Sequence, residues 1–380
     1  MNRLVIVGNG FDLAGGLPTS YESFLLDYFA NALQSLRDRS NQYRYTDEII
    51  EIYFSDGEPE IGDQEVLVKQ YSSLEEMISE EKIVFQFYED SLFLFEYPRW
   101  VVRIKSKFLN EMLRGDTWSN IEGAYFDQLL RIHSVSEKRR QFDQIKRLNT
   151  ELSQLKVLLT NYLAKVDKNG GNKRMDYILE ECFEKAGDKY YNRFFKKFPF
   201  EPIIEEVRDY KRGQIVDNII FLNFNYTGFL EEQLHFFTRG EGSYKIWPIH
   251  GTLKNARSII FGYGDETHAQ YQSLENSGND ELLKNIKSFY YPSSNYYLDL
   301  INFLEEGVYD VHVLGHSLGL SDRVLLKTIF ENVNCKAIRL FHRGIEQSHF
   351  RLRIALSRHF SDKPSMRRKI VEYNELDRLG

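Results

Sequence analysis

Three features are scarce or missing in this sequence, and each absence excludes a class of protein. Only Cys182 and Cys335 occur among 380 residues. They lie far apart and without metal-ligand spacing, which is typical of a reduced, intracellular protein rather than a disulfide scaffold. No run of about 18 or more apolar residues exists, so no membrane-spanning helix is predicted. The formal net charge is −7, so no overall positive field attracts nucleic acid or an anionic membrane, although a local basic patch remains open.

A secretion signal is also missing from the N-terminal stretch "MNRLVIVGNG". It has no long apolar region and no cleavage site, so we expect a cytoplasmic protein that does not associate with membranes. The remaining composition is that of a globular protein, with 42% hydrophobic and 28% charged residues. This length accommodates one large domain or two moderate ones.

The chain opens on a strand, a glycine turn and a helix, which is how a parallel α/β sheet begins. The run "RLVIVG" is continuous and β-branched, as expected of a strand buried on both faces, and it leads into Gly8-Asn9-Gly10. Thr19 and Glu22 then have the spacing of a capping box before a stretch with a helical apolar face.

The middle of the chain changes character. Residues 45–68 are acidic and rich in loop formers, and Ser73-x-x-Glu76 predicts the start of another capped helix. Between residues 145 and 166 apolar side chains recur every three or four positions, which predicts a long helix with an apolar seam. That seam packs either within a helical hairpin of the same chain or against another subunit.

Strands return after residue 215. Five short apolar runs end in Gly, Asn or His, at 214–225, 244–251, 256–264, 308–317 and 335–342. We therefore predict an α/β fold with a Rossmann-like parallel sheet interrupted by a large insertion. The predicted boundaries are an α/β domain at 1–35 and 215–360, a mainly helical insertion at 36–214, and a C-terminal tail at 361–380.

The stretch Gly315-His316-Ser317-Leu318-Gly319 has the G-x-S-x-G pattern of an α/β-hydrolase nucleophile. That fold needs an acid and then a histidine on later strands. Asp322 follows too closely, and the remaining aspartates come after the last histidine, His359. Ser317 is therefore not expected to be a nucleophile.

Small and polar residues follow several of the predicted strands, where a doubly wound sheet binds its ligands. Gly8 and Gly10 suit a phosphate because glycine lets backbone amides approach an anion. The G-x-G-x-x-G fingerprint is incomplete, since Leu13 occupies the third glycine position, and no G-K-[ST] follows. The alternative is a tight turn without a ligand.

Two further residues carry possible chemistry. Asn225 in "NFNYT" could position a reacting group, and His250 in "PIHG" could move a proton. Taken singly, each has a structural alternative, because Asn225 could cap the next helix and His250 could form a hydrogen bond in the core. On neighbouring strands of one sheet they form a plausible catalytic pair.

These segments resemble the AbiH family of bacterial abortive-infection (phage-defence) proteins, and through it the sirtuin-like NAD-binding fold. The resemblance rests on "LVIVGNGFDLAGGLPTSYESFL", "FLNFNYTGFLE", "IHGTLKN" and "VLGHSLGLSD", in that order. It covers residues 1–29 and about 215–345. The middle of the chain carries no matching motif.

The resemblance implies roles for several positions. Asn225 and His250 match the catalytic asparagine and histidine of sirtuin-like NADases. The implied nucleotide-binding positions are Gly8, Asn9, Gly10, Asp12, Ser317 and Asp322. The sequence departs from the T-x-N-x-D motif, with Asn223 and Thr227 flanking the asparagine, and no Cys-x-x-Cys zinc module of the deacetylases is present.

The implied activity is that of an NAD⁺ glycohydrolase, with NAD as substrate and no metal expected. Because such chemistry is hazardous to a cell, we expect restraint by homo-oligomerisation or by a phage-derived trigger. The alternative is a nucleotide-binding sensor or interaction module, with an effector directed at nucleic acid. The basic stretches at 137–147 and 366–369 keep that alternative open.

Overall fold

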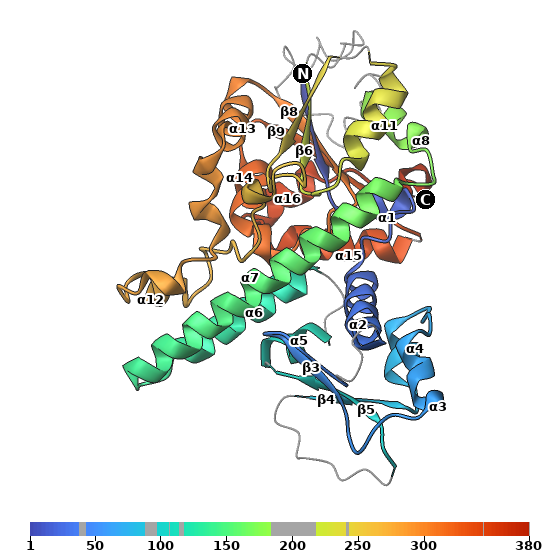
Figure 1. Ribbon diagram of the computed structural model, residues 1–380. Coiled ribbons are helices and arrows are strands. Elements are labelled where there is room, and N and C mark those ends of the chain that lie inside the picture. Colours follow the sequence, from blue (N-terminus) through green and yellow to red (C-terminus); the bar gives the residue numbers. More distant parts are fainter. Residues whose placement is uncertain are drawn as a thin grey trace. The chain divides into compact units, whose positions relative to one another are not determined.

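A computed structural model of the chain describes residues 1–37, 43–87, 97–105, 107–113, 118–183, 218–240, 243–344 and 346–379. They form two compact units (Figure 1). The first unit comprises Met1–Leu17, Leu163–His268 and Ile286–Gly380. The second comprises Pro18–Tyr162 and Ala269–Asn285.

A five-stranded parallel sheet forms the centre of the first unit. Its order is β7-β6-β1-β8-β9, with the N-terminal strand in the middle. The strands are β1 (Asn2–Val7), β6 (Ile219–Asn223), β7 (Tyr244–Pro248), β8 (Tyr309–Leu314) and β9 (Cys335–Phe341). The prediction of a parallel α/β sheet whose first strand is N-terminal and whose other strands follow residue 215 is confirmed.

The strands end together at one edge of this sheet. Val7 is paired in register with Asn223 on one side and with Leu314 on the other. Asn223 is paired in turn with Pro248. The turns that follow β1, β6, β7 and β8 therefore leave the sheet side by side.

One of the five predicted strands does not form. Residues 256–264 contain a short 3-10 turn, η2 (Ala256–Ser258), followed by irregular chain. Ile259 and Ile260 are buried, and the Ile260 amide donates to the His250 carbonyl. The apolar run therefore covers the carboxyl edge of the sheet instead of extending it, and burial alone could not distinguish these roles.

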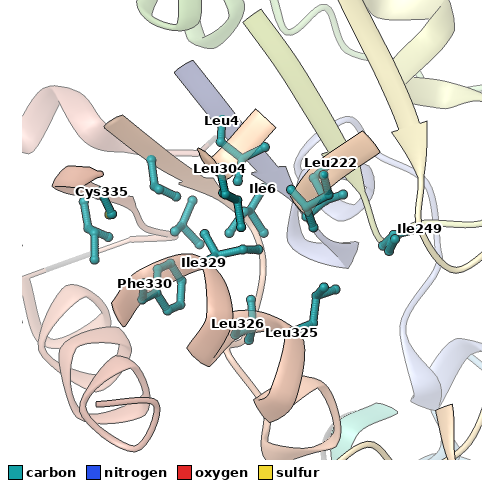
Figure 2. Packing of buried hydrophobic residues seen from close by; sticks show 14 of the residues in the cluster. Leu4, Ile6, Leu222, Ile249, Leu304, Leu325, Leu326, Ile329, Phe330 and Cys335 are labelled. Atoms are coloured by element: carbon teal, nitrogen blue, oxygen red, sulfur yellow. The ribbon is translucent and has the colours of Figure 1, made fainter. Parts of the chain in front are cut away.

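Helices cover both faces of the sheet. On one face the core includes side chains of α13 (Asn295–Glu306), α14 (Arg323–Glu331) and α15 (Glu346–Ser357), as Figure 2 shows for part of the cluster. On the other face, Phe183 of α8 (Asp176–Phe183) contacts Phe221 of β6, with ring centroids 6.0 Å apart. Burial on both faces explains the continuous apolar runs at 4–7 in β1 and 219–222 in β6.

The C-terminal segment protects the edge strand β9. After α16 (Lys363–Lys369), the Val371 amide donates to the Ile338 carbonyl. Further along, the His342 amide donates to the Asp377 carbonyl, and the Leu379 amide donates to His342. This pairing covers backbone groups that an edge strand would otherwise expose.

The second unit contains a sheet that the sequence analysis did not foresee. Its four strands have the order β2-β3-β5-β4. They are β2 (Arg44–Thr46), β3 (Ile50–Phe54), β4 (Ile83–Gln86) and β5 (Trp100–Ile104). Residues 45–68, which include most of β2 and all of β3, are predicted to be rich in loops, and the insertion that contains β4 and β5 is predicted to be mainly helical. Runs of three to five residues are too short for apolar periodicity to distinguish strand from helix.

Two helix starts in the second unit test the predicted caps. Ser73 caps α4 (Leu74–Ile78) as predicted, because its hydroxyl accepts the Glu76 amide at 3.1 Å. At α2 (Tyr21–Arg37) the cap lies one residue later than predicted. Ser20, not Thr19, accepts the amide of Ser23, at 3.1 Å.

The remaining elements of this unit are α3 (Ile61–Gln64), η1 (Glu65–Leu67), α5 (Lys107–Leu113), α6 (Trp118–His133), α12 (Tyr271–Glu275) and η3 (Asp280–Leu282).

The predicted long helix is α7 (Lys138–Asn169). Every side chain of its apolar seam is buried within the chain. The seam consists of Ile145, Leu148, Leu152, Leu155, Leu159, Tyr162 and Val166. A hydrogen bond of 2.8 Å from the Tyr125 hydroxyl to Asn149 joins α6 to α7. The hairpin interpretation is therefore confirmed.

Among the described residues, no helix is long and apolar enough to cross a bilayer.

Candidate functional site

The turns after β1 and β8 pack backbone against backbone. The Gly8 amide donates to the Leu314 carbonyl at 2.9 Å, and the Gly10 amide donates to the Gly315 carbonyl at 2.8 Å. A Cβ on Gly8 would lie 2.6 Å from the Cα of His316, so only glycine allows this approach. Gly315, with φ of 67°, is in the left-handed region that favours glycine.

These contacts change how the glycine turn is understood. The turn lies at the carboxyl edge, as predicted. However, the Gly8 amide is already paired with the last residue of β8 and the Gly10 amide with the turn after it, so these amides do not point toward a phosphate as predicted. The helix that follows, α1 (Asn9–Ala14), is only 6 residues long. The two glycines instead allow the turns after β1 and β8 to touch.

Replacing Gly10 with Ala is expected to lower the free energy of unfolding by about 1–3 kcal/mol, because overpacking forces the two turns apart. The new Cβ would lie 2.8 Å from the Cα of Gly315. Gly307→Ala is the matched control, since its Cβ meets nothing within 4 Å and its φ of 172° is extended. Urea unfolding of both variants measures the difference. Equal losses in the two variants would show that the turns do not pack as described.

A buried carboxyl group joins the turn after β1 to the turn after β6. Asp12 accepts hydrogen bonds from Thr227 Oγ1 at 2.5 Å and from Asn225 Nδ2 at 2.7 Å. Burial raises the pKa of Asp12 to about 7, the two hydrogen bonds oppose the rise, and the carboxylates of Asp167 and Glu231 add to it. Asp12 therefore titrates near neutral pH.

The side chain of Asn225 is fixed in one orientation. Its Nδ2 donates to Asp12 and, at 3.2 Å, to the Gly8 carbonyl. Its backbone amide donates to Asn223 Oδ1 at 3.0 Å. No described residue donates a hydrogen bond to Oδ1 of Asn225, so this oxygen remains for a ligand hydroxyl or a water molecule.

A second polar cluster lies at the end of β7 and around η6 (Leu320–Asp322). His250 Nε2 lies 3.2 Å from Asp322 Oδ1, although the ring is not aligned for a regular hydrogen bond. Lys287 Nζ donates to the same oxygen at 2.8 Å. His316 Nε2 lies 3.7 Å from Asp322 Oδ2. All four side chains are buried.

Charge and burial set the protonation states of this cluster. Burial alone would raise the pKa of Asp322, but Lys287, followed by His250 and His316, holds it well below its usual value. Burial and then Lys287 lower the pKa of His250, against the opposing effect of Asp322. Burial also lowers the pKa of His316, to about 4. At neutral pH the cluster therefore combines a carboxylate, an ammonium group and two neutral imidazoles.

Phe224 connects the two polar clusters. Its ring centroid lies 4.9 Å from that of His250 and 4.4 Å from that of His316, both in edge-on geometry. The next residue, Asn225, points to Asp12 on the other side. The structure thus brings the turns after β1, β6, β7 and β8 to one place, where the sequence analysis had expected them to meet.

The G-x-S-x-G stretch does not form a nucleophile elbow. Ser317 is exposed, and the positive φ in this turn belongs to Leu318 (56°) and Gly315, whereas an elbow strains the serine itself. The imidazole of the preceding residue, His316, accepts the Leu318 amide at 3.0 Å. The exclusion of Ser317 as a nucleophile agrees with this geometry.

Sequence reasoning missed some of the residues that make the site. Lys287 was missed because it opens a short 3-10 turn, η4 (Lys287–Phe289), and shares no motif with Asp322. Thr227 was noted only as a departure from the T-x-N-x-D motif. The carboxylate of Asp322 faces Lys287 and the imidazoles of His250 and His316, and its expected nucleotide-binding role stays a prediction. A lysine and a carboxylate that are distant in sequence give no signal without an alignment of homologues.

Metal ligands are not grouped in this region. Within the described ranges, no three or more His, Cys, Asp or Glu side chains are arranged to hold an ion. The polar groups of the site are instead hydrogen-bond donors and acceptors, together with the two neutral imidazoles of His250 and His316.

Comparison with known proteins assigns the family. No curated protein and no solved structure matched the chain. The family model described as bacteriophage abortive infection AbiH matches residues 4–343, which include all four turns of the site. The chain therefore belongs to the AbiH family of bacteriophage abortive-infection proteins.

Proposed function

We propose that this chain is an NAD⁺ glycohydrolase with a Rossmann-like, sirtuin-like core, which hydrolyses the bond between nicotinamide and ribose. The strand order supports this core. Numbered along the chain within the sheet, β7-β6-β1-β8-β9 reads 3-2-1-4-5, as in doubly wound nucleotide-binding sheets. Ligands of such sheets bind beyond the carboxyl ends where the order reverses, which here lies between β1 and β8.

The observation that carries the proposal is the His250–Asp322 contact at this edge. The carboxylate of Asp322 faces Nε2 of the His250 imidazole. No described residue forms a hydrogen bond with Nδ1 of His250. A neutral imidazole that is oriented by a carboxylate can take a proton through its other nitrogen. Lys287 keeps the carboxylate ionised, so the proton does not pass on to Asp322.

Asn225 supplies the positioning group. With Nδ2 held by Asp12 and Gly8, Oδ1 can accept a hydrogen bond from a ribose hydroxyl or from the attacking water. In the proposed step, water oxygen bonds to C1′ of the ribose while the bond from C1′ to nicotinamide breaks. The bonding electrons leave with nicotinamide, and the water proton passes to Nδ1 of His250. The products are nicotinamide and ADP-ribose.

Unsatisfied polar atoms also support a polar ligand at this edge. Nδ2 of Asn223 and Oγ of Ser321 are buried without a hydrogen-bond partner among the described residues. Such atoms are rare in native proteins and usually indicate an additional partner, such as water or a ligand. On the turns after β1 and β8, the half-buried Asn9 and the exposed Ser317 are the polar side chains proposed to contact the phosphates.

The test is to incubate the purified protein with NAD⁺, NADP⁺ and ATP and to separate the products by chromatography. We expect nicotinamide and ADP-ribose in equal amounts from NAD⁺, with ATP unchanged. Because the activity is expected to be restrained until infection, the same products are also measured in cells that carry the protein and are under phage attack. The NAD⁺ concentration should fall in those cells. NAD⁺ that stays intact in both settings would contradict the proposal.

A second candidate is a nucleotide-binding sensor that does not turn its ligand over. The burial of His250 and Asn225, which are 4% and 7% exposed, favours it, because a catalytic base must reach its substrate. Calorimetry with NAD⁺ and ADP-ribose separates the two candidates. Saturable binding of both ligands without nicotinamide release would support the sensor.

A further inference from the structure

The last helices of the first unit are basic, although the chain as a whole carries a net negative charge. Residues 343–369 contain eight Lys or Arg and two Asp or Glu, Glu346 and Asp362, in a chain whose net charge is −7. Both helices of this segment, α15 and α16, pack on β9 (Figure 1).

The lysines and the arginines of this segment have different environments. Lys363 donates to the carbonyls of Ser357 and Phe360, and Lys369 donates to those of Phe330 and Asn332. These ammonium groups stabilise the chain itself. Five arginines, in contrast, are exposed and form no ion pair or side-chain hydrogen bond within the described part of the chain. They are Arg343, Arg351, Arg358, Arg367 and Arg368.

The outward face of α15 combines arginine with an aromatic ring. Residues 347, 351, 354 and 358 follow the helical spacing of one face, and Phe350 lies beside them. Phe350 is 52% exposed and Ile354 is 43% exposed. The guanidinium of Arg353 lies over the Phe350 ring, 5.4 Å from its centroid. We call Phe350, Arg351 and Arg358 on this side of α15 the arginine face; Arg343 precedes it in the chain, and Arg367 and Arg368 follow it on α16.

We propose that the arginine face binds single-stranded nucleic acid. Guanidinium groups without acidic partners match phosphate oxygens, which they can bind in a bidentate manner. An exposed ring supported by a guanidinium offers a surface on which an unpaired base can stack. This binding does not depend on the proposed NAD⁺ hydrolysis.

An anionic membrane fits this face less well than nucleic acid does. Interfacial helices insert a broad apolar face into the lipid headgroup region. The apolar side of α15 is already used, because Leu356 lies in the core and Leu352 packs against it. Only Phe350 and Ile354 are left for a bilayer, between arginines.

The test measures fluorescence anisotropy of labelled single-stranded RNA and DNA of about 20 nucleotides with the full chain, at about 50–200 mM salt. We expect the triple variant Arg351→Gln, Arg358→Gln, Arg367→Gln to bind about tenfold or more weakly. Its log–log salt slope should fall by about 2, since each lost phosphate contact on a single strand contributes about 0.7.

The matched control is Lys138→Gln, Arg139→Gln, Arg140→Gln on α7, which removes the same charge from exposed positions. The control should bind like the wild type, and circular dichroism should show both triple variants folded. The proposal is overturned if the wild type does not bind at the lowest salt, or if the control loses as much affinity. It is also overturned if phosphatidylserine vesicles are bound while nucleic acid is not.

Discussion

Replacing Asp12 with Asn is expected to raise the free energy of unfolding at pH 8 by on the order of 4 kcal/mol, and to change it little near pH 4. The folded-state pKa of Asp12 is raised from the ordinary value of 3.8 to about 7, mainly by burial. The protonated Asp12 carboxyl therefore contributes its full stability below the unfolded-state pKa. This contribution is lost as the pH rises through the folded-state pKa and the carboxyl ionises. Asn stays neutral and avoids this loss.

The geometry makes Asn a suitable replacement. Its Oδ1 can accept the hydrogen bond from Asn225, and its Nδ2 can donate to Thr227, whose hydroxyl can turn from donor to acceptor. The difference in stability between variant and wild type should grow by about 1.4 kcal/mol per pH unit between about pH 5 and pH 7, as for a single proton.

Urea unfolding at several pH values measures this slope, with Asp299→Asn on the exposed side of α13 as the control. The control should parallel the wild type at every pH. A constant difference between Asp12→Asn and wild type from pH 5 to pH 8 would show that Asp12 is already ionised in the acidic range, and that burial does not govern its titration.

Apolar runs and their periodicity were sufficient to predict the long helix and the strands of the parallel sheet. The buried strand before Gly8, the long helix with its seam, and the strands at 219–223, 244–248, 309–314 and 335–341 follow from apolar runs and their periodicity. The segment at 256–264 has a similar run, yet it crosses the end of the sheet. The strands of the second unit are too short to show a period at all.

The candidate site was predictable in position but not in its bonding. Residues at the ends of parallel strands must share an edge, so Asn225 and His250 could be placed together from the sequence. The hydrogen bonds that determine their chemistry join positions far apart in the chain, as between Asp12 and Thr227 or between Lys287 and Asp322. No spacing rule links such pairs. The pairing of the Gly8 and Gly10 amides with β8 and the turn after it was hidden for the same reason.

Replacing His250 with Gln is expected to lower the rate of nicotinamide release by ~10²–10⁴-fold, the usual contribution of a general base. Gln keeps a polar side chain at this buried position but cannot accept a proton. His235→Gln, the same change at an exposed position on α11 (Phe229–Thr238), should leave the rate unchanged. Circular dichroism should show both variants folded.

The pH profile of the wild-type rate gives an independent readout of the same role. Because burial and Lys287 lower the pKa of His250, the imidazole stays unprotonated below its ordinary value of 6.5. A base works in its unprotonated form, so the rate should fall only when the pH drops below that value. His250→Gln should lose this acidic limb along with most of its rate. A variant that keeps both the wild-type rate and the limb would assign the proton transfer to another group and leave His250 a structural role beside Asp322.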